Sequence, residues 1–211
     1  IAYNVPANFP LWMAVIGCFV AVVVVKQLYG GIGKNFVNPA ITARIFLFIS
    51  FAANMSTWPL PRMAETTDAT TGATPLGILA EGGAGAKLPS NMDMFLGFIG
   101  GSVGEGSALA LLIGGAYLIW KKVISPIIPC AFIGTVFVIA LIYTKSFHMA
   151  VFHILAGGVM LGAIFMATDY VTSPFTLKGK LVYGVALGIV TFAIRYWGSY
   201  TEGVSFALLF M

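Results

Sequence analysis

Residues 126–143 read PIIPCAFIGTVFVIALIY, an apolar stretch that contains no charged residue. A helix needs about 20 predominantly apolar residues to cross the hydrocarbon core of a bilayer, and fewer when flanking Lys or Arg side chains reach the interface. Lys121 and Lys122 precede this stretch, and Lys145 follows it. We therefore predict that residues 126–143 form a membrane-spanning helix.

The composition of the whole chain agrees with this prediction. Of the 211 residues, 59% are apolar and only 9% are charged, against about 25% charged residues in average soluble domains. The mean hydropathy is +0.97, which excludes a soluble globular domain and also a disordered chain. We predict an all-α polytopic membrane protein, a helical bundle surrounded by the lipid bilayer. The net charge of +4 reflects helix orientation, so we expect no nucleic-acid partner.

Other segments predict further helices and one long loop. The expected crossings are residues 11–28, 39–54, 108–120, 150–168 and 181–197, and another apolar segment begins at residue 202. Residues 93–101 are too short to cross and lead into GGSVGEGS at 100–107, which predicts a re-entrant half-helix. The chain then divides into helices with a Gly-rich connection (1–54), a functional loop (55–92), and the re-entrant segment with further helices (93–211).

The basic residues predict the orientation of these helices. If Lys121 and Lys122 face the cytoplasm, the alternation of crossings places four more lysines on the same side, namely Lys26, Lys34, Lys178 and Lys180. An excess of cytoplasmic basic residues is typical of membrane proteins. This orientation places the 55–92 loop on the outer side of the membrane.

Two polar interruptions on the cytoplasmic side resemble each other. Residues 30–39 and 169–174 each end in a small polar residue before a proline. Paired interruptions mark binding sites in transporter-like folds, and two ordinary helix connections are the alternative interpretation. Neither a phosphate-binding loop nor a metal site is predicted, because GGIGKN at 30–35 lacks the required Ser or Thr and His148 and His153 do not share a helix face.

The 55–92 loop contains DATTGATP at residues 68–75. Gly72 and Ala73 leave room for another molecule to approach the backbone. Pro75 disfavours helix at Thr74, so the hydroxyl of Thr74 is not used by a helical carbonyl. Taken alone, this stretch is a turn with threonines.

TGAT at 71–74 resembles the flavinylation motif of membrane subunits of the Rnf complex and of the sodium-translocating NADH:quinone reductase. Other stretches match the same family in the same order: GGIGKNFVNPA at 30–40, GEGS at 104–107, LIGGAY at 112–117, FMATDYVTSP at 165–174 and EGVS at 202–205. Pro75 and DYVTSP at 169–174 favour the D-type subunit of the Rnf complex, whereas GKNF at 33–36 leans towards the B-type subunit of the quinone reductase. The family carries further N-terminal helices, so we expect this chain to be part of a longer one.

The resemblance implies an electron-transfer subunit in a bacterial or archaeal cell membrane. Its complex would couple ferredoxin–NAD electron transfer to sodium or proton movement, so enzymatic activity would belong to the complex and the other subunits would be partners. The resemblance also implies FMN bound covalently to Thr74 by a flavin transferase, a second non-covalent flavin (riboflavin), and a urea-transporter-like fold. The residues expected to bind flavin are Thr74, Asp68, Thr71, Gly72, Ala73, Asn38, Arg44, Thr172 and Ser173.

The sequence allows two interpretations for each of three charged residues. Arg44 either extends to the cytoplasmic interface or pairs with the flavin or with Asp169. Asp169 is either an interface residue or a ligand on an ion path, and Glu105 either suits the positive end of a helix or lies on that path. Two other function classes stay open: a channel or transporter for a small solute or ion, and a structural scaffold.

Overall fold

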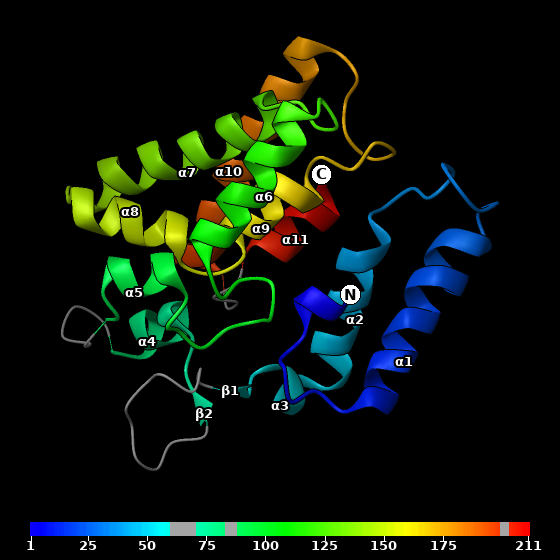
Figure 1. Cartoon of the computed structure of the whole chain (residues 1–211), viewed down its shortest axis with the longest axis horizontal. Helices are drawn as coiled ribbons and strands as arrows, with labels where there is room; N and C mark the ends of the chain where they lie inside the picture. The colour runs from blue at the N-terminus through cyan, green and yellow to red at the C-terminus, as the bar shows by residue number, and fades with distance from the viewer. Residues whose placement is uncertain (60–70, 83–87, 199–202) are drawn as a thin grey trace.

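The computed structural model describes residues 1–59, 71–82, 88–198 and 203–211, and this part of the chain is mostly helical (Figure 1). Residues 71, 72 and 82 are described by their backbone alone. The first half of the chain contains η1 (Ala2–Asn4), α1 (Leu11–Phe19), η2 (Val20–Gln27), α2 (Pro39–Ser50), α3 (Ala52–Met55), β1 (Trp58–Pro59), β2 (Thr71–Gly72), α4 (Pro75–Gly82) and α5 (Asn91–Leu96). The second half contains α6 (Ala108–Trp120), α7 (Ile127–Thr144), α8 (Phe147–Leu155), α9 (Val159–Leu161), η4 (Gly162–Met166), α10 (Leu177–Trp197) and α11 (Gly203–Phe210).

Two helices of the described residues, α7 and α10, are long and apolar enough to cross a membrane. A third candidate span is the pair formed by Phe147–Leu155 and Val159–Met166, which is bent by 64°. Three shorter apolar helices accompany them: Leu11–Gln27, Pro39–Ser50 and Ala108–Trp120. The predicted class, a helical membrane protein, is therefore consistent with the structure.

The predicted helix at 108–120 has the observed bounds, whereas other predicted segments differ. The predicted crossing at 150–168 is not one continuous helix, because the chain breaks between α8 and α9, and the bent pair is a candidate for a single broken span. The predicted segment 39–54 is interrupted at Phe51, whose φ of −132° and ψ of 49° leave the helical region. The predicted loop at 55–92 contains helix α4 and a short antiparallel pairing of β1 with β2.

Helices α7 and α10 pack closely because two glycines of α10 face α7. A Cβ at Gly184 would lie 2.7 Å from the Cβ of Ala131, and a Cβ at Gly188 would lie 2.6 Å from the Cβ of Thr135. The two glycines are four residues apart, so they lie on one face of the helix. Small residues at this spacing let membrane helices approach closely.

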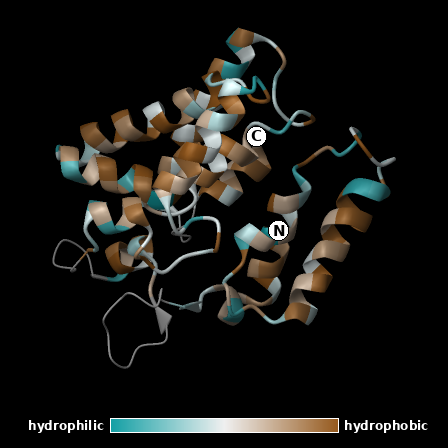
Figure 2. Ribbon diagram, in the orientation of Figure 1, coloured by the Kyte–Doolittle hydropathy of each residue, from teal (hydrophilic) through white to brown (hydrophobic). Residues whose placement is uncertain are grey.

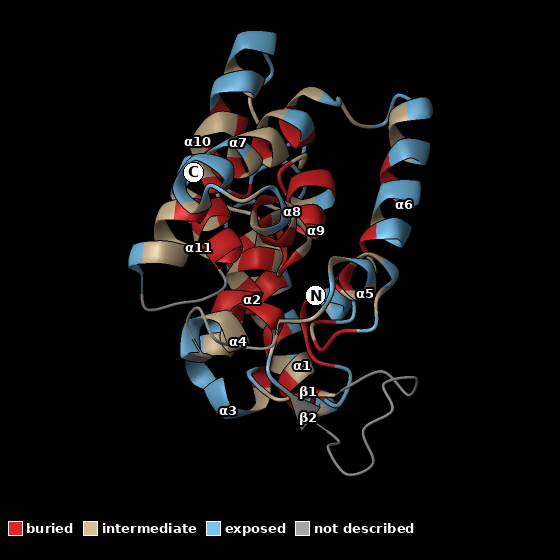
Figure 3. Cartoon of the chain, turned by 90° about the vertical axis from the view of Figure 1, so that its left-hand side faces the viewer, coloured by how far each residue is buried: buried red, intermediate tan, exposed pale blue. Residues whose placement is uncertain are grey.

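The buried core lies where α2, α7, α10 and α11 meet, with Phe132 of α7 and Leu187 of α10 fully buried at its centre. Figure 3 shows buried residues concentrated on α2, α9 and α11, whereas α6 is mostly exposed. Large apolar side chains remain on the outside of the helices, for example Leu11, Ile113 and Ile142, and Figure 2 shows hydrophobic ribbon along α1 and α7. A helical surface of this kind suits contact with lipid.

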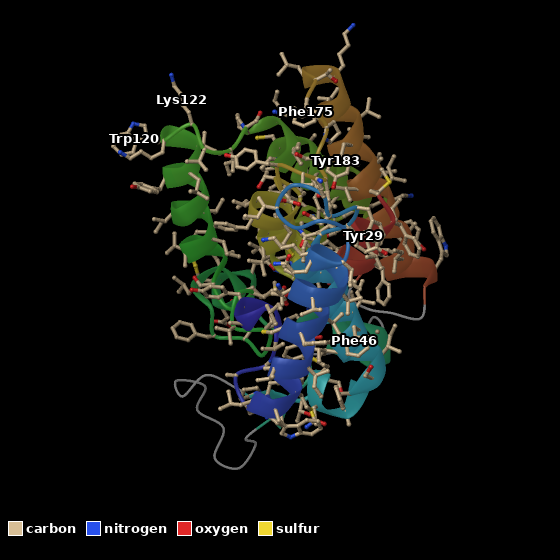
Figure 4. The ribbon with its side chains drawn as sticks, turned by 90° about the vertical axis from the view of Figure 1, so that its right-hand side faces the viewer. Tyr29, Phe46, Trp120, Lys122, Phe175 and Tyr183 are labelled. Carbon is tan, nitrogen blue, oxygen red and sulfur yellow. The ribbon has the colours of Figure 1, made fainter. Side chains whose placement is uncertain are left out.

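The two ends of the molecule differ in the segments that they carry. Strands β1 and β2 lie with α3 and α4 at one end, and the 28–38 connection between η2 and α2 lies at the other (Figure 1). Figure 4 places Trp120 and Lys122, at the end of α6, and Phe175 far from the β1–β2 end. The segment that carries Thr74 and the predicted cytoplasmic Lys122 are therefore at opposite ends.

Candidate functional site

Thr74 stands at the N-terminus of helix α4, immediately after strand β2. The N–H of Gly77 donates to Thr74 Oγ1 at 3.1 Å, and the N–H of Ile78 donates to the Thr74 carbonyl at 2.9 Å. Thr is a favoured N-cap residue, and Pro75 suits the first helical position because it has no N–H to leave unpaired. Local sequence therefore places the hydroxyl of Thr74 at the positive end of the helix dipole.

Thr74 lines a cavity of about 270 Å³. The walls come from four parts of the chain: Arg44, Ile45 and Phe48 of α2, the segment with Met55, Ser56 and Trp58, residues 73–81 of the α4 region, and Ser205 and Phe206 of α11. Aromatic and aliphatic residues dominate the lining, and its polar residues are Arg44, Ser56, Thr74, Glu81 and Ser205. A mostly apolar cavity with a few polar groups is typical of a ligand site.

Arg44 forms a buried ion pair at the wall of this cavity. Its Nη1 donates to Glu105 Oε1 at 2.8 Å and to Asn4 Oδ1 at 3.1 Å. The exposed fractions are 5% for Arg44, 7% for Glu105 and 4% for Asn4. The interpretation that Arg44 extends to the interface was therefore wrong, because a guanidinium at the interface would be exposed.

The break between α8 and α9 adjoins both Arg44's partner and the Thr74 helix. A Cβ at Gly158 would lie 2.8 Å from Glu105 Oε1, so the carboxylate lies against this glycine. At Gly157, whose φ is +64°, a Cβ would lie 2.7 Å from Leu76 Cδ1. Leu76 is the second residue of α4 and packs in one cluster with Phe152 of α8.

Arg195 of α10 caps the C-terminus of α8, which is the first half of the broken helix. Its Nη1 donates to the His153 carbonyl at 2.7 Å, and its Nη2 donates to the Ala156 carbonyl at 2.8 Å. The last carbonyls of a helix have no partner within the helix, and a cation there also complements the dipole. Next to this arginine, His153 Nε2 lies 3.0 Å from the hydroxyl of Tyr196.

A second cavity, of about 330 Å³, lies where the two polar interruptions meet. It is lined by Lys26, Ile32, Gly33, Asn35, Asn38, Pro39, Ala40, Asp169 and Val171. The structure thus brings together the stretches 30–39 and 169–174, which the sequence presents as a weak internal repeat.

Asn38 is held in this second region by three hydrogen bonds. Its Oδ1 accepts from the N–H groups of Ala40 at 3.0 Å and Ile41 at 3.3 Å, which caps α2. Its Nδ2 donates to the Met166 carbonyl at 3.4 Å. Asn38 is therefore the N-cap of α2, and the same side chain joins the start of α2 to the end of η4.

Asp169 begins a hydrogen-bonded turn that ends at Ser173. The hydroxyl of Thr172 donates to Asp169 Oδ2 at 3.1 Å, and the N–H of Ser173 donates to the Asp169 carbonyl at 3.1 Å. Thr172 and Ser173 therefore support Asp169, which lines the second cavity.

The predicted flavin-binding residues fall into two groups. Ala73, Thr74 and Arg44 line the first cavity, whereas Asn38 lines the second and Thr172 and Ser173 belong to the turn beside it. Thr71 and Gly72 form β2, opposite Pro59 and Trp58. Asp68 lies outside the described residues.

Sequence reasoning missed the partner of Arg44 and much of the cavity wall. Trp58, Ser205 and Phe206 carry no local signal that marks them as wall residues. Glu105 did carry a signal, because a buried arginine requires a partner of opposite charge and Glu105 is an acid between two glycines near an apolar segment.

Comparison with known proteins shows that the whole chain matches one protein family. The profile of the NQR2, RnfD, RnfE family matches residues 1–211. The D-type subunit of the Na(+)-translocating ferredoxin:NAD(+) oxidoreductase complex of Acetobacterium woodii is 46% identical over 214 residues, which cover 100% of this chain and 65% of that protein. The D-type subunit of the proton-translocating ferredoxin:NAD(+) oxidoreductase complex of Clostridium ljungdahlii is 41% identical and covers 98% of this chain and 65% of that protein.

The quinone-reductase branch is also similar to this chain. The B-type subunit of the Na(+)-translocating NADH-quinone reductase of Klebsiella pneumoniae is 40% identical over 228 residues, which cover 99% of this chain and 54% of that protein. The chain thus spans slightly less than two thirds of the length of the two ferredoxin:NAD(+) oxidoreductase relatives and about half of the quinone-reductase relative.

Proposed function

Because the chain belongs to the NQR2, RnfD, RnfE family, we propose that it is a membrane electron-transfer subunit with FMN bound to Thr74 through a phosphoester. Its complex, of the Rnf type, couples ferredoxin–NAD electron transfer to sodium or proton translocation, and the other subunits of that complex are its partners. The corresponding subunit of the quinone reductase is the alternative within the family. The activity belongs to the assembled complex, and this chain contributes the FMN through which electrons pass.

The cavity that joins Thr74 to Arg44 is the observation that carries this proposal. The Thr74 hydroxyl is the ester oxygen, and it stands at a helix N-terminus, where a phosphate is favoured by the dipole and by the N–H of Gly77. Arg44, which is paired with Glu105, lines the same cavity. Pockets that bury a drug-sized ligand have about 300–1,000 Å³, so the cavity of about 270 Å³ accommodates part of the FMN and leaves the rest outside.

The residues around this site contribute to cofactor binding in different ways. The bound FMN supplies the redox chemistry. The short β1–β2 pairing and the packing of Leu76 against α8 hold the N-terminus of α4 in place. The walls from Trp58, Phe48 and Phe206 exclude water from the apolar part of the ligand. A covalent tether removes the association cost of a diffusing cofactor.

The proposed location is a bacterial or archaeal cell membrane, with residues 55–92 on the outer side. The excess of lysine near the far end of the molecule supports this orientation, and Lys122 lies at that end (Figure 4). A flavin transferase on the outer side then has access to Thr74, which is partly exposed.

The second cavity is the proposed site of a non-covalent flavin such as riboflavin. Asn38, Asn35 and Lys26 supply hydrogen-bond donors and acceptors, and Asp169 supplies a carboxylate. Asp169 is a candidate for an ion path, and Glu105 is the alternative candidate unless its carboxylate serves the flavin instead. Riboflavin has no phosphate group, so its binding here would need no phosphate contact.

A non-redox channel or transporter with a urea-transporter-like fold is the second candidate function. The 64° bend between Phe147–Leu155 and Val159–Met166 favours it, because broken helices recur at transporter binding sites. It predicts no covalent cofactor at Thr74.

In-gel fluorescence of the full-length subunit separates these functions. The subunit is produced in cells that express a flavin transferase, denatured in acid and run on a gel. We expect a fluorescent band for the unmodified chain and a dark band for Thr74→Val, because valine retains the shape of threonine but has no hydroxyl. A dark band for the unmodified chain supports the transporter, and a fluorescent Thr74→Val band shows that the attachment site is elsewhere.

A further inference from the structure

The cavity wall next to Thr74 contains a pair of opposite charges whose net charge is zero. Arg44 Nη1 lies 2.8 Å from Glu105 Oε1, and the two side chains are 6% and 4% exposed. Charges that are shielded from water interact strongly with their surroundings, because the local dielectric constant is low. The balance between these two charges therefore contributes to the electrostatic potential inside the cavity.

The two members of the pair have different positions relative to the cavity. Among the described residues, Arg44 is part of the cavity wall, whereas Glu105 lies behind it against Gly158 at the start of α9. Glu105 therefore acts on a ligand in the cavity through Arg44: it orients the guanidinium and neutralises its charge. Asn4 accepts a second hydrogen bond from the same Nη1, which fixes the direction of the guanidinium further.

We propose that Glu105 is a positioning residue that lowers the reduction potential of the flavin on Thr74 by neutralising Arg44. This inference rests on the proposed function, since it concerns the same cofactor. It assigns Glu105 to the control of the flavin rather than to an ion path.

The sign of the effect follows from the charge change on reduction. One electron leaves a reduced carrier of the same complex, which is oxidised, and the flavin ring gains one negative charge if no proton accompanies the electron. An unbalanced cation in the wall of the cavity would stabilise this negative form. Glu105 removes that imbalance, so the ring is harder to reduce with Glu105 than without it.

The test uses the assembled complex with full-length subunit variants. Glu105→Gln keeps an oxygen for the hydrogen bond to Arg44 but removes the charge. The double variant Arg44→Gln with Glu105→Gln removes both charges and restores a neutral pair. Asp93→Asn is the matched control, because it also replaces a carboxylate by an amide, but Asp93 is on α5 and lines neither of the two cavities.

Redox titration by absorbance gives the midpoint potential of this flavin, as the difference between each complex and its Thr74→Val counterpart. We expect a shift to a more positive potential in Glu105→Gln and a return towards the unmodified value in the double variant. The Asp93→Asn control should stay near the unmodified value. A merely structural role of Glu105 would not be reversed by a second substitution, so the return distinguishes electrostatic positioning from general damage.

An unchanged potential in Glu105→Gln, with the fluorescent band retained, overturns this inference and leaves the proposed function intact. Absence of the band in the unmodified protein overturns both. If Glu105→Gln does not accumulate, Glu105→Asp replaces it: the shorter side chain withdraws the carboxylate from Arg44, which should give a smaller shift in the same direction. An unchanged potential in that variant is equally decisive against the inference.

Discussion

Replacing Gly188 by alanine should separate helices α7 and α10. The added Cβ would lie 2.6 Å from Thr135 Cβ, 2.8 Å from Thr135 Cγ2 and 3.2 Å from the Phe132 carbonyl oxygen. Two of these contacts involve atoms fixed close to the α7 backbone, so rotation of a side chain cannot relieve them all. Overpacking of this kind costs about 1–3 kcal/mol.

The matched control is Gly134→Ala on α7, where a new Cβ would meet no described atom within 4 Å. Both substitutions gain about 1 kcal/mol of helix propensity, so the difference between them isolates the packing cost. We expect Gly188→Ala to unfold about 2–12 °C below Gly134→Ala, at about 2–4 °C per kcal/mol for a chain of this size. The measurement is thermal unfolding of the full-length subunit in detergent, followed by far-ultraviolet circular dichroism. Equal unfolding temperatures would refute the close approach of the two helices.

Three further predictions concern the cavities and the helix break. Gly77→Val should reduce the fluorescence of the flavin band. The new Cβ alone would lie 3.3 Å from Thr74 Oγ1, so the valine would crowd a phosphate bound there. Undiminished fluorescence would contradict an ester at Thr74. Gly158→Ala places a Cβ 2.8 Å from Glu105 Oε1 and should shift the flavin potential in the same direction as Glu105→Gln, by redox titration. Asn38→Ala should destabilise the protein by about 1 kcal/mol in the same thermal assay, and Asn38→Ser should recover part of this loss, because serine also caps helices.

Local signals in the sequence were sufficient for several elements. The bounds of α6 follow from an apolar segment that begins after Ser107, a favoured N-cap, and ends at Lys121. Asn38 and Pro39 mark the start of α2 for the same reason. Such signals depend on a few neighbouring residues, so they survive in the folded protein.

The helix break could not be predicted from hydropathy, because the apolar pattern continues through residues 150–168. The break depends on the left-handed conformation of Gly157 and on Arg195, which lies 39 residues from its bonding partner Ala156. The pairing of Arg44 with Glu105, 61 residues apart, is equally non-local. Thr74 and Arg44 were both identified as flavin-binding candidates, but only the fold places them around one cavity.

The saturation of the α8 terminus by Arg195 has a consequence for motion in the membrane. The chain supplies its own donors to the carbonyls of His153 and Ala156 at the end of α8, so no bound ion is required to satisfy them. Leu76 also occupies the space above Gly157, which opposes a straight helix. The joint therefore has a fixed location, and any change in the angle between α8 and α9 is confined to residues 156–158.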